Sequence, residues 1–229
     1  MIVQDKAYSI SFEVKPGETI ALVGPTGSGK TSVISLITRF YEPQQGRILM
    51  DGLDLMTATV QSLHEQIGIV TQENFLFTGT IMENLKFGRP AATDDEVIEA
   101  AKKLGTHEII VRLANGYQSK VGERGGNFSA GERQLITFTR AMVAQPRILI
   151  LDEATSAVDP QTETIIQHAL EKLFARRTCF VVAHRLSTVR NAHRILVLNG
   201  GEIIEQGTHA ELLARAGHYA RLHEEFVRQ

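Results

Sequence analysis

Short runs of apolar residues alternate with amphipathic stretches along this chain, which is the pattern of a mixed α/β protein. Residues 8–14 alternate between apolar and polar side chains, which predicts a half-buried strand. Residues 148–151 are all apolar, which predicts a central strand of a parallel sheet, buried on both faces. Further strands are predicted at residues 19–23, 46–52 (with a turn), 68–70, 179–183 and 195–198, and a hairpin at residues 194–206.

The region from Thr80 to Ala144 has a helical pattern and separates two groups of predicted strands. Residues 93–96, Thr-Asp-Asp-Glu, place acidic side chains at the start of a helix, where they complement its dipole. Residues 129–132, Ser-Ala-Gly-Glu, form a capping box that opens another helix. We therefore expect a single domain over residues 1–229, with an α/β core at 1–72 and 141–229 and a helical subdomain inserted at 73–140.

Composition limits the classes of function. The net charge is −2 and the pI is near 6.5, which argues against a nucleic-acid-binding surface. The lone cysteine, Cys179, lies in an apolar stretch, so we expect a buried hydrophobe and no disulfide within the chain. No apolar run is long enough to span a membrane, and the N-terminus lacks a signal-peptide pattern. We therefore expect a polypeptide that does not itself cross a membrane.

The most informative motif is Gly-Pro-Thr-Gly-Ser-Gly-Lys-Thr at residues 24–31, which has the form G-x-x-x-x-G-K-[ST] of a phosphate-binding loop. A predicted strand precedes it and a predicted helix follows, which distinguishes it from a glycine-rich surface turn. Backbone N–H groups and the helix dipole would hold phosphates, Lys30 would add a positive charge, and the Thr31 hydroxyl would bind Mg²⁺. The motif predicts that a nucleoside triphosphate is bound by Gly24, Pro25, Thr26, Gly27, Ser28, Gly29, Lys30, Thr31 and Ser32.

Two carboxylates, Asp152 and Glu153, follow the predicted strand at residues 148–151. Ligands of open α/β sheets bind at the carboxyl ends of the strands. One carboxylate can hold Mg²⁺ and its neighbour can accept a proton from an attacking water. An acidic turn after a strand is a common alternative, but the phosphate loop in the same chain favours the catalytic interpretation.

Four further motifs accompany these two in a fixed order. Gln72 follows a predicted strand, residues 128–132 read Phe-Ser-Ala-Gly-Glu, residues 156–159 read Ser-Ala-Val-Asp, and His184 follows an apolar run. The ordered set resembles the nucleotide-binding domain of ATP-binding-cassette (ABC) transporters over essentially the whole chain. The four motifs match the family's glutamine loop, its Leu-Ser-Gly-Gly-Gln signature, its aspartate loop and its switch histidine.

The resemblance implies an ATPase with a P-loop NTPase core that binds ATP and Mg²⁺. It assigns Mg²⁺ to Thr31, Gln72 and Asp152, and catalysis to Glu153, His184 and Lys30. Glu153 would be the general base, and His184 would hold the γ-phosphate. Two such domains, identical or different, would pair head to tail, with each ATP between one phosphate loop and the partner's signature helix. The resemblance also assigns nucleotide contacts to Ser129, Gly131, Glu132 and Asp159.

Several of these residues also have ordinary structural interpretations. Ser129 and Glu132 form a capping box, and Asp159 before a proline fits a helix N-cap. For the signature the two interpretations agree, because a capped helix N-terminus is also an anion site. His184 could be a core histidine at a strand end, and Gln72 could be a polar residue after a strand.

The chain departs from the family pattern in two places. Ala130 replaces a glycine of the signature, and Glu132 places a negative charge where the family has glutamine. If Glu132 caps its own helix, the effect on the partner's site is expected to be small; otherwise that site would hydrolyse slowly. Family members also stack adenine on an aromatic residue before the first strand. Residues 1–7 contain none, and Tyr8 fits the strand's inward face better, so we expect an excised domain with a truncated start.

Three segments, residues 75–81, 120–126 and 183–188, resemble exporters. The resemblance therefore implies the motor of an exporter at the cytoplasmic face of a cell membrane, acting on membrane domains that this chain lacks. The main alternative is the separate ATPase subunit of an importer, which usually has Thr-His-Asp around its histidine. A soluble P-loop kinase would lack the signature. A DNA-acting ABC ATPase would carry coiled coils or zinc-binding cysteines, and neither is present in this sequence.

Overall fold

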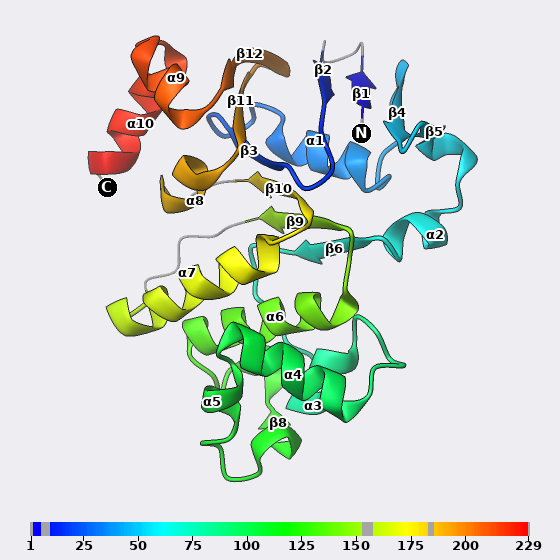
Figure 1. Cartoon of the computed structure of the whole chain (residues 1–229), viewed down its shortest axis with the longest axis vertical. Helices are drawn as coiled ribbons and strands as arrows, with labels where there is room; N and C mark the ends of the chain where they lie inside the picture. Colours follow the sequence, from blue (N-terminus) through cyan, green and yellow to red (C-terminus); the bar gives the residue numbers. More distant parts are fainter. Residues whose placement is uncertain (1, 6–9, 153–157, 183–185, 229) are drawn as a thin grey trace. The chain divides into compact units, whose positions relative to one another are not determined.

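The computed structural model describes residues 2–5, 10–152, 158–182 and 186–228 of the chain (Figure 1). Contacts divide it into two compact units. The first contains residues 1–67, 147–153 and 176–229, and the second contains residues 68–146 and 154–175. Each unit has its own cluster of buried hydrophobic residues.

The first unit is built on a mainly parallel sheet, which confirms the predicted α/β class. Its strands follow the order β12-β11-β3-β10-β9, in which β12 is the antiparallel partner of β11 and the other neighbours are parallel. Val181 of β10 pairs with Ala21 on one side and Leu151 on the other. The strands are β3 (Thr19–Val23), β9 (Ile148–Asp152), β10 (Thr178–Val182), β11 (Arg194–Asn199) and β12 (Glu202–Gly207).

Burial explains why this sheet forms where the apolar runs lie. Every residue of β3 is buried, as are the first four of β9, which confirms the prediction of strands covered on both faces. Helix α1 packs Val33, Leu36 and Ile37 into the hydrophobic core of this unit. The helices of this unit are α1 (Lys30–Ile37), α2 (Val60–His64), α8 (Leu186–Asn191), α9 (His209–Ala214) and α10 (His218–Arg228).

A smaller antiparallel sheet completes the first unit, in the order β2-β1-β4-β5. The predicted strand at residues 8–14 is present as β2 at residues 10–13, whereas Tyr8 lies outside the described residues. The inner strand β1 was not predicted, because its sequence, Ile-Val-Gln-Asp, does not alternate between apolar and polar residues. The bounds are β1 (Ile2–Asp5), β2 (Ile10–Glu13), β4 (Gly46–Met50) and β5 (Leu53–Asp54), followed by the 3₁₀ turn η1 (Leu55–Thr57).

The second unit is mainly helical, as the pattern between Thr80 and Ala144 predicts. Helix α6 is its centre and packs against α3, α4 and α7. The unit includes α7, so it spans more of the chain than residues 73–140. The helices are α3 (Ile81–Lys86), α4 (Asp94–Leu104), α5 (His107–Ile110), α6 (Ala130–Ala144) and α7 (Pro160–Phe174). The short strands and turns are β6 (Ile67–Val70), β7 (Gly79–Thr80), β8 (Lys120–Val121), η2 (Gly116–Gln118) and η3 (Glu123–Gly125).

Side-chain caps explain where α3, α4, α6 and α7 begin. Thr93 Oγ1 accepts a hydrogen bond from the Glu96 N–H at 3.2 Å, and the Glu96 carboxylate accepts one from the Thr93 N–H at 2.9 Å. This capping box confirms the predicted helix start at residues 93–96. Cys179 is fully buried in β10, as expected, and burial raises the pKa of its thiol to about 12. Among the helices of the described residues, none is both long and apolar enough to cross a membrane.

Candidate functional site

The phosphate loop connects β3 directly to α1 (Figure 1). Gly27 and Gly29 have φ values of 80° and 105°, in the region that residues with a Cβ avoid. These two glycines let the backbone fold back over itself, so that its N–H groups can converge on an anion. Around them, Pro25, Thr26 and Thr31 are exposed, whereas Ser28 is buried.

The N-terminus of α1 lacks the capping box that begins α3, α4, α6 and α9. Its N-cap is Gly29, which provides no side-chain cap, and its first turn contains no acidic residue. The first helical hydrogen bond runs from the Val33 N–H to the Gly29 carbonyl at 3.0 Å. The N–H groups of residues 30–32 therefore precede the helical ladder and point out of the helix end. This is the arrangement that binds phosphate at a helix N-terminus.

Lys30 lies over the loop. Its Nζ donates hydrogen bonds to the carbonyls of Gly24 and Pro25, at 2.7 and 2.9 Å. Partial burial lowers the pKa of Lys30, and the nearby Asp152 carboxylate opposes this effect. The ammonium group of Lys30 therefore lies at the loop where the sequence motif predicts that it binds phosphate.

Asp152 ends β9 at the same edge of the sheet as the phosphate loop. In the parallel register, Val182 of β10 lies opposite both Asp152 and Leu22 of β3. The loop starts at Gly24, two residues after Leu22, so both features lie at the carboxyl ends of parallel strands, β3 and β9, with β10 between them. Ligands of open parallel sheets bind at this edge. The predicted general base Glu153 and the predicted γ-phosphate ligand His184 lie outside the described residues.

The signature segment begins α6 in the second unit. Ser129 Oγ accepts the Glu132 N–H at 3.2 Å, and the Glu132 carboxylate accepts the Ser129 N–H at 2.8 Å. The capping box predicted from residues 129–132 is therefore confirmed, and Glu132 is engaged with its own helix. Gly131 is buried, and a Cβ there would lie 2.3 Å from Thr162 Cγ2, so only glycine permits this approach of α7.

Gln72 and the signature share one open cavity within the second unit. It has a volume of about 400 Å³ and is lined by Gln72, Glu73, Asn74, Phe75, Arg124, Gly126, Ala130 and Arg133. Arg133, on the signature helix, contacts the segment before it. Its Nη1 donates hydrogen bonds to the carbonyls of Phe128 and Gly125, at 2.5 and 3.4 Å. The structure therefore links the start of the signature helix to the end of the segment at residues 120–126.

Asp159 is the N-cap of α7, as its position before a proline predicts. Its carboxylate accepts a hydrogen bond from the Thr162 N–H at 3.0 Å, which lowers the pKa of Asp159. The side chain is exposed. Because the capping side chain is exposed, it remains accessible to a partner.

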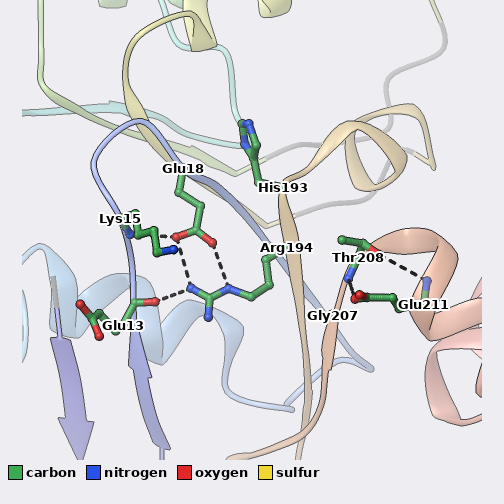
Figure 2. A pocket seen from close by; sticks show the side chains of 8 residues that line it. All are labelled: Glu13, Lys15, Glu18, His193, Arg194, Gly207, Thr208 and Glu211. Carbon is green, nitrogen blue, oxygen red and sulfur yellow. Dashed lines mark hydrogen bonds and ion pairs between the residues drawn. The ribbon is translucent and has the colours of Figure 1, made fainter.

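Another open cavity, of about 340 Å³, lies in the first unit at the amino ends of β3 and β11. Figure 2 shows Arg194 directed at the Glu18 carboxylate, with Nε 3.0 Å from Oε1, and at the backbone carbonyl of Glu13. The Thr19 N–H donates to His193 Nδ1 at 2.9 Å. This cavity lies at the opposite end of β3 from the phosphate loop, and the Glu18 carboxylate in it is paired with Arg194. We therefore treat it as distinct from the nucleotide site.

Sequence reasoning missed Arg140, which organises the segment after Gln72. Its guanidinium donates to the Phe75 carbonyl at 3.0 Å and to Asn84 Oδ1 at 2.8 Å, and it lies 5.2 Å from the centre of the Phe77 ring. Burial lowers the pKa of Arg140 to about 10. An arginine in the middle of a helix carries no local signal for this role, because its partners are more than fifty residues away.

Comparison with known proteins supplies the family. Residues 8–156 match the model of the ABC transporter family. A fatty acid ABC transporter ATP-binding/permease protein of Mycobacterium tuberculosis is 51% identical over 93% of this chain and 34% of its own length. Heavy metal tolerance factor 1 of Caenorhabditis elegans is 53% identical over 94% of this chain and 27% of its own length. The solved structure of a bacterial Atm1-family ABC exporter with ATP bound superimposes with a TM-score of 0.88, at 44% identity over 95% of this chain and 38% of that chain.

The chain therefore belongs to the ABC transporter family. It is a nucleotide-binding ATPase domain of the exporter type, as the three exporter-like segments predict. It spans between about a quarter and two fifths of the length of these three proteins. The similarity to an exporter favours this class over the importer subunit that was the main alternative.

Proposed function

We propose that this domain binds MgATP at its phosphate loop and hydrolyses it to drive transport by associated membrane domains. The backbone around Gly29 carries this proposal. It combines left-handed glycines with a helix end that has no acidic side chain and no side-chain cap. Both features favour a multiply charged anion over a neutral ligand.

Thr31, Asp152 and Gln72 would hold the magnesium ion. All three offer oxygen atoms, which Mg²⁺ prefers as ligands. Thr31 is exposed beside the loop, and Asp152 is half-buried at the same edge of the sheet, so these two fit the ion. When bound, the ion would neutralise charge on the phosphate oxygens.

The remaining roles follow from the family resemblance and from the geometry of the loop. Lys30 would hold the β- and γ-phosphates, because its ammonium group already lies over the loop. Glu153 would take a proton from the attacking water, and His184 would hold a γ-phosphate oxygen. The nucleotide would also contact the loop residues from Gly24 to Ser32.

Two domains would close head to tail, so that the signature of one completes the site of the other. Ser129 and Asp159 are both exposed in the single chain, which supports contact with a partner. The N-terminus of α6, to which Ser129, Gly131 and Glu132 belong, would direct its helix dipole at the partner's nucleotide. Closure on ATP and opening after hydrolysis would be the mechanical cycle.

The second unit would present the docking face for the membrane domains, at the cytoplasmic face of the membrane. Phe77 and Phe87 stack with their ring centres 4.2 Å apart, and Phe75 lies edge-on to Phe77. All three rings are at least 37% exposed, which is unusual for an apolar group of this size. Phe75 also lines the cavity that contains Arg124 of the segment at 120–126. The relatives that join ATP-binding and permease parts in one chain support this choice of partner.

The Glu153→Gln variant tests the catalytic part of the proposal. Loss of a general base is expected to slow single-turnover hydrolysis by about 10²–10⁴-fold and to leave ATP binding intact. The Glu171→Gln variant is the control, because Glu171 is an exposed acidic residue on α7. Hydrolysis by Glu153→Gln at the rate of this control would remove Glu153 from the mechanism.

A further inference from the structure

The glycine turn between β11 and β12 lies against the phosphate loop. The Gly201 N–H donates a hydrogen bond to the Ser28 carbonyl at 3.1 Å. The loop meets the same hairpin at two more points. A Cβ on Gly24 would lie 2.2 Å from the Leu198 carbonyl oxygen, and a Cβ on Gly29 would lie 3.6 Å from Gly201 Cα. Gly24, Ser28 and Gly29 of the loop therefore all lie against one hairpin.

The hydrogen bond from Gly201 fixes the direction of a peptide group inside the loop. The Ser28 carbonyl and the Gly29 N–H belong to the same planar trans peptide, so they point in opposite directions. Because the carbonyl points at the hairpin, the Gly29 N–H points to the opposite side, away from the hairpin. That N–H is one of the donors that a phosphate loop offers to its anion.

We propose that Gly201 is a positioning residue for nucleotide binding, which acts by holding the Ser28–Gly29 peptide in the orientation that binds phosphate. The proposal rests on the proposed function of the loop. Gly201 does not touch the nucleotide in this account. Residue 201 is glycine because its φ is 83°, which residues with a Cβ avoid. The group that positions the loop is the backbone N–H of Gly201.

The lone cysteine makes a direct test possible. A synthetic peptide of residues 179–229 can be ligated at Cys179 to residues 1–178, which leaves the sequence unchanged. Replacement of the Gly201 amide by an ester removes the N–H donor and weakens the preceding carbonyl as an acceptor, so the control has to share both changes. The control is an ester at Leu212, in the same peptide, whose N–H donates to the Thr208 carbonyl at 3.0 Å. The all-amide ligated chain is the reference.

The measurements are the dissociation constant of a fluorescent ATP analogue and the thermal midpoint. Both esters should lower the midpoint, since each loses one backbone hydrogen bond. The Gly201 ester alone should raise the dissociation constant, by roughly threefold to tenfold, the range expected for one hydrogen bond. Equal dissociation constants for the two esters would overturn the proposal, because the bond would then serve only the fold.

The Lys30→Ala variant separates this proposal from the proposed function. If Lys30→Ala weakens binding and the Gly201 ester does not, only the positioning role is wrong. If Lys30→Ala binds as tightly as the reference, the loop is not the binding site and both proposals fail.

A measurement on the unmodified chain covers the case in which the esters do not fold. A non-hydrolysable ATP analogue should slow hydrogen exchange at the Gly201 amide more than at the Gly17 amide. Gly17 is the matched comparison, because its φ is 78° and its N–H donates to Thr178 Oγ1 at 3.0 Å. Equal slowing at both glycines would contradict the positioning role.

Discussion

Ser129 and Glu132 satisfy each other's backbone N–H groups at the start of α6, through hydrogen bonds of 2.8 and 3.2 Å. The negative charge that replaces the family's glutamine is thus used within its own helix. This arrangement favours the expectation that Glu132 has little effect on the partner's site. An amide oxygen can accept the same hydrogen bond, so the two residue types are equivalent in the cap.

The Glu132→Gln variant should therefore keep both the stability and the activity of the domain. We expect its free energy of unfolding to change by less than about 0.5 kcal/mol and its ATP hydrolysis by less than about twofold. Glu132→Ala should lose about 0.5–1 kcal/mol, because the Ser129 N–H then lacks its acceptor. Denaturant titrations and steady-state hydrolysis check both variants. A tenfold faster Glu132→Gln enzyme would show that the carboxylate acts on the bound phosphate.

Gly131 should be required for packing as well as for any contact with nucleotide. Because its Cβ would lie 2.3 Å from Thr162 Cγ2, Gly131→Ala should destabilise the domain by about 1–3 kcal/mol. The double variant Gly131→Ala/Thr162→Ser removes that methyl group and should recover part of the loss. Val158 Cγ1, at 3.0 Å, would still prevent full recovery. Chemical denaturation of the four proteins gives the coupling energy, and additive effects would contradict the packing argument.

Much of this fold could be predicted because local chemistry and long-range burial agree. The apolar run at residues 148–151 is a buried strand, and the caps at Thr93, Ser129 and Asp159 begin helices where the sequence places them. The hairpin at Asn199-Gly200-Gly201 is also present, because its two glycines adopt positive φ values.

The features that the sequence did not predict depend on partners that are distant along the chain. Strand β8 consists of Lys120 and Val121 and exists only because it pairs with β7. The segment at residues 120–126 therefore reads as a polar loop in isolation. Likewise, nothing near Gly201 indicates that its N–H meets the Ser28 carbonyl. The roles of Glu153 as general base and of His184 as γ-phosphate ligand remain predictions from the sequence and the family resemblance.

Cys179 should make the stability of the domain depend on pH in alkaline solution. Burial raises the pKa of its thiol to about 12, whereas the thiol of an unfolded chain ionises at about pH 8.5. Above that pH the unfolded state binds fewer protons than the native state. The thiol therefore lowers the free energy of unfolding as pH rises, by up to about 1.4 kcal/mol per pH unit.

Denaturant unfolding between pH 8 and pH 10 checks this effect in the wild type and in Cys179→Ala. The wild type should lose stability more steeply across this range, even though the alanine variant has the weaker core at every pH. Tyr117 and Tyr219, whose pKa values burial also raises to about 12, are common to both proteins. Parallel pH profiles would mean that the thiol ionises in the native state.

The most direct test of the central claim, that each active site is shared by two subunits, is to mix two inactive variants. Lys30→Ala lacks the phosphate-loop cation, and Ser129→Arg blocks the signature helix. Each variant alone should hydrolyse little ATP, because both of its sites are defective. A mixed dimer keeps one site that joins the intact loop of Ser129→Arg to the intact signature of Lys30→Ala. Equimolar mixing should therefore recover about a quarter of wild-type hydrolysis. If mixing recovers nothing, or if Ser129→Arg alone hydrolyses ATP at the wild-type rate, the sites are not shared and the account is wrong.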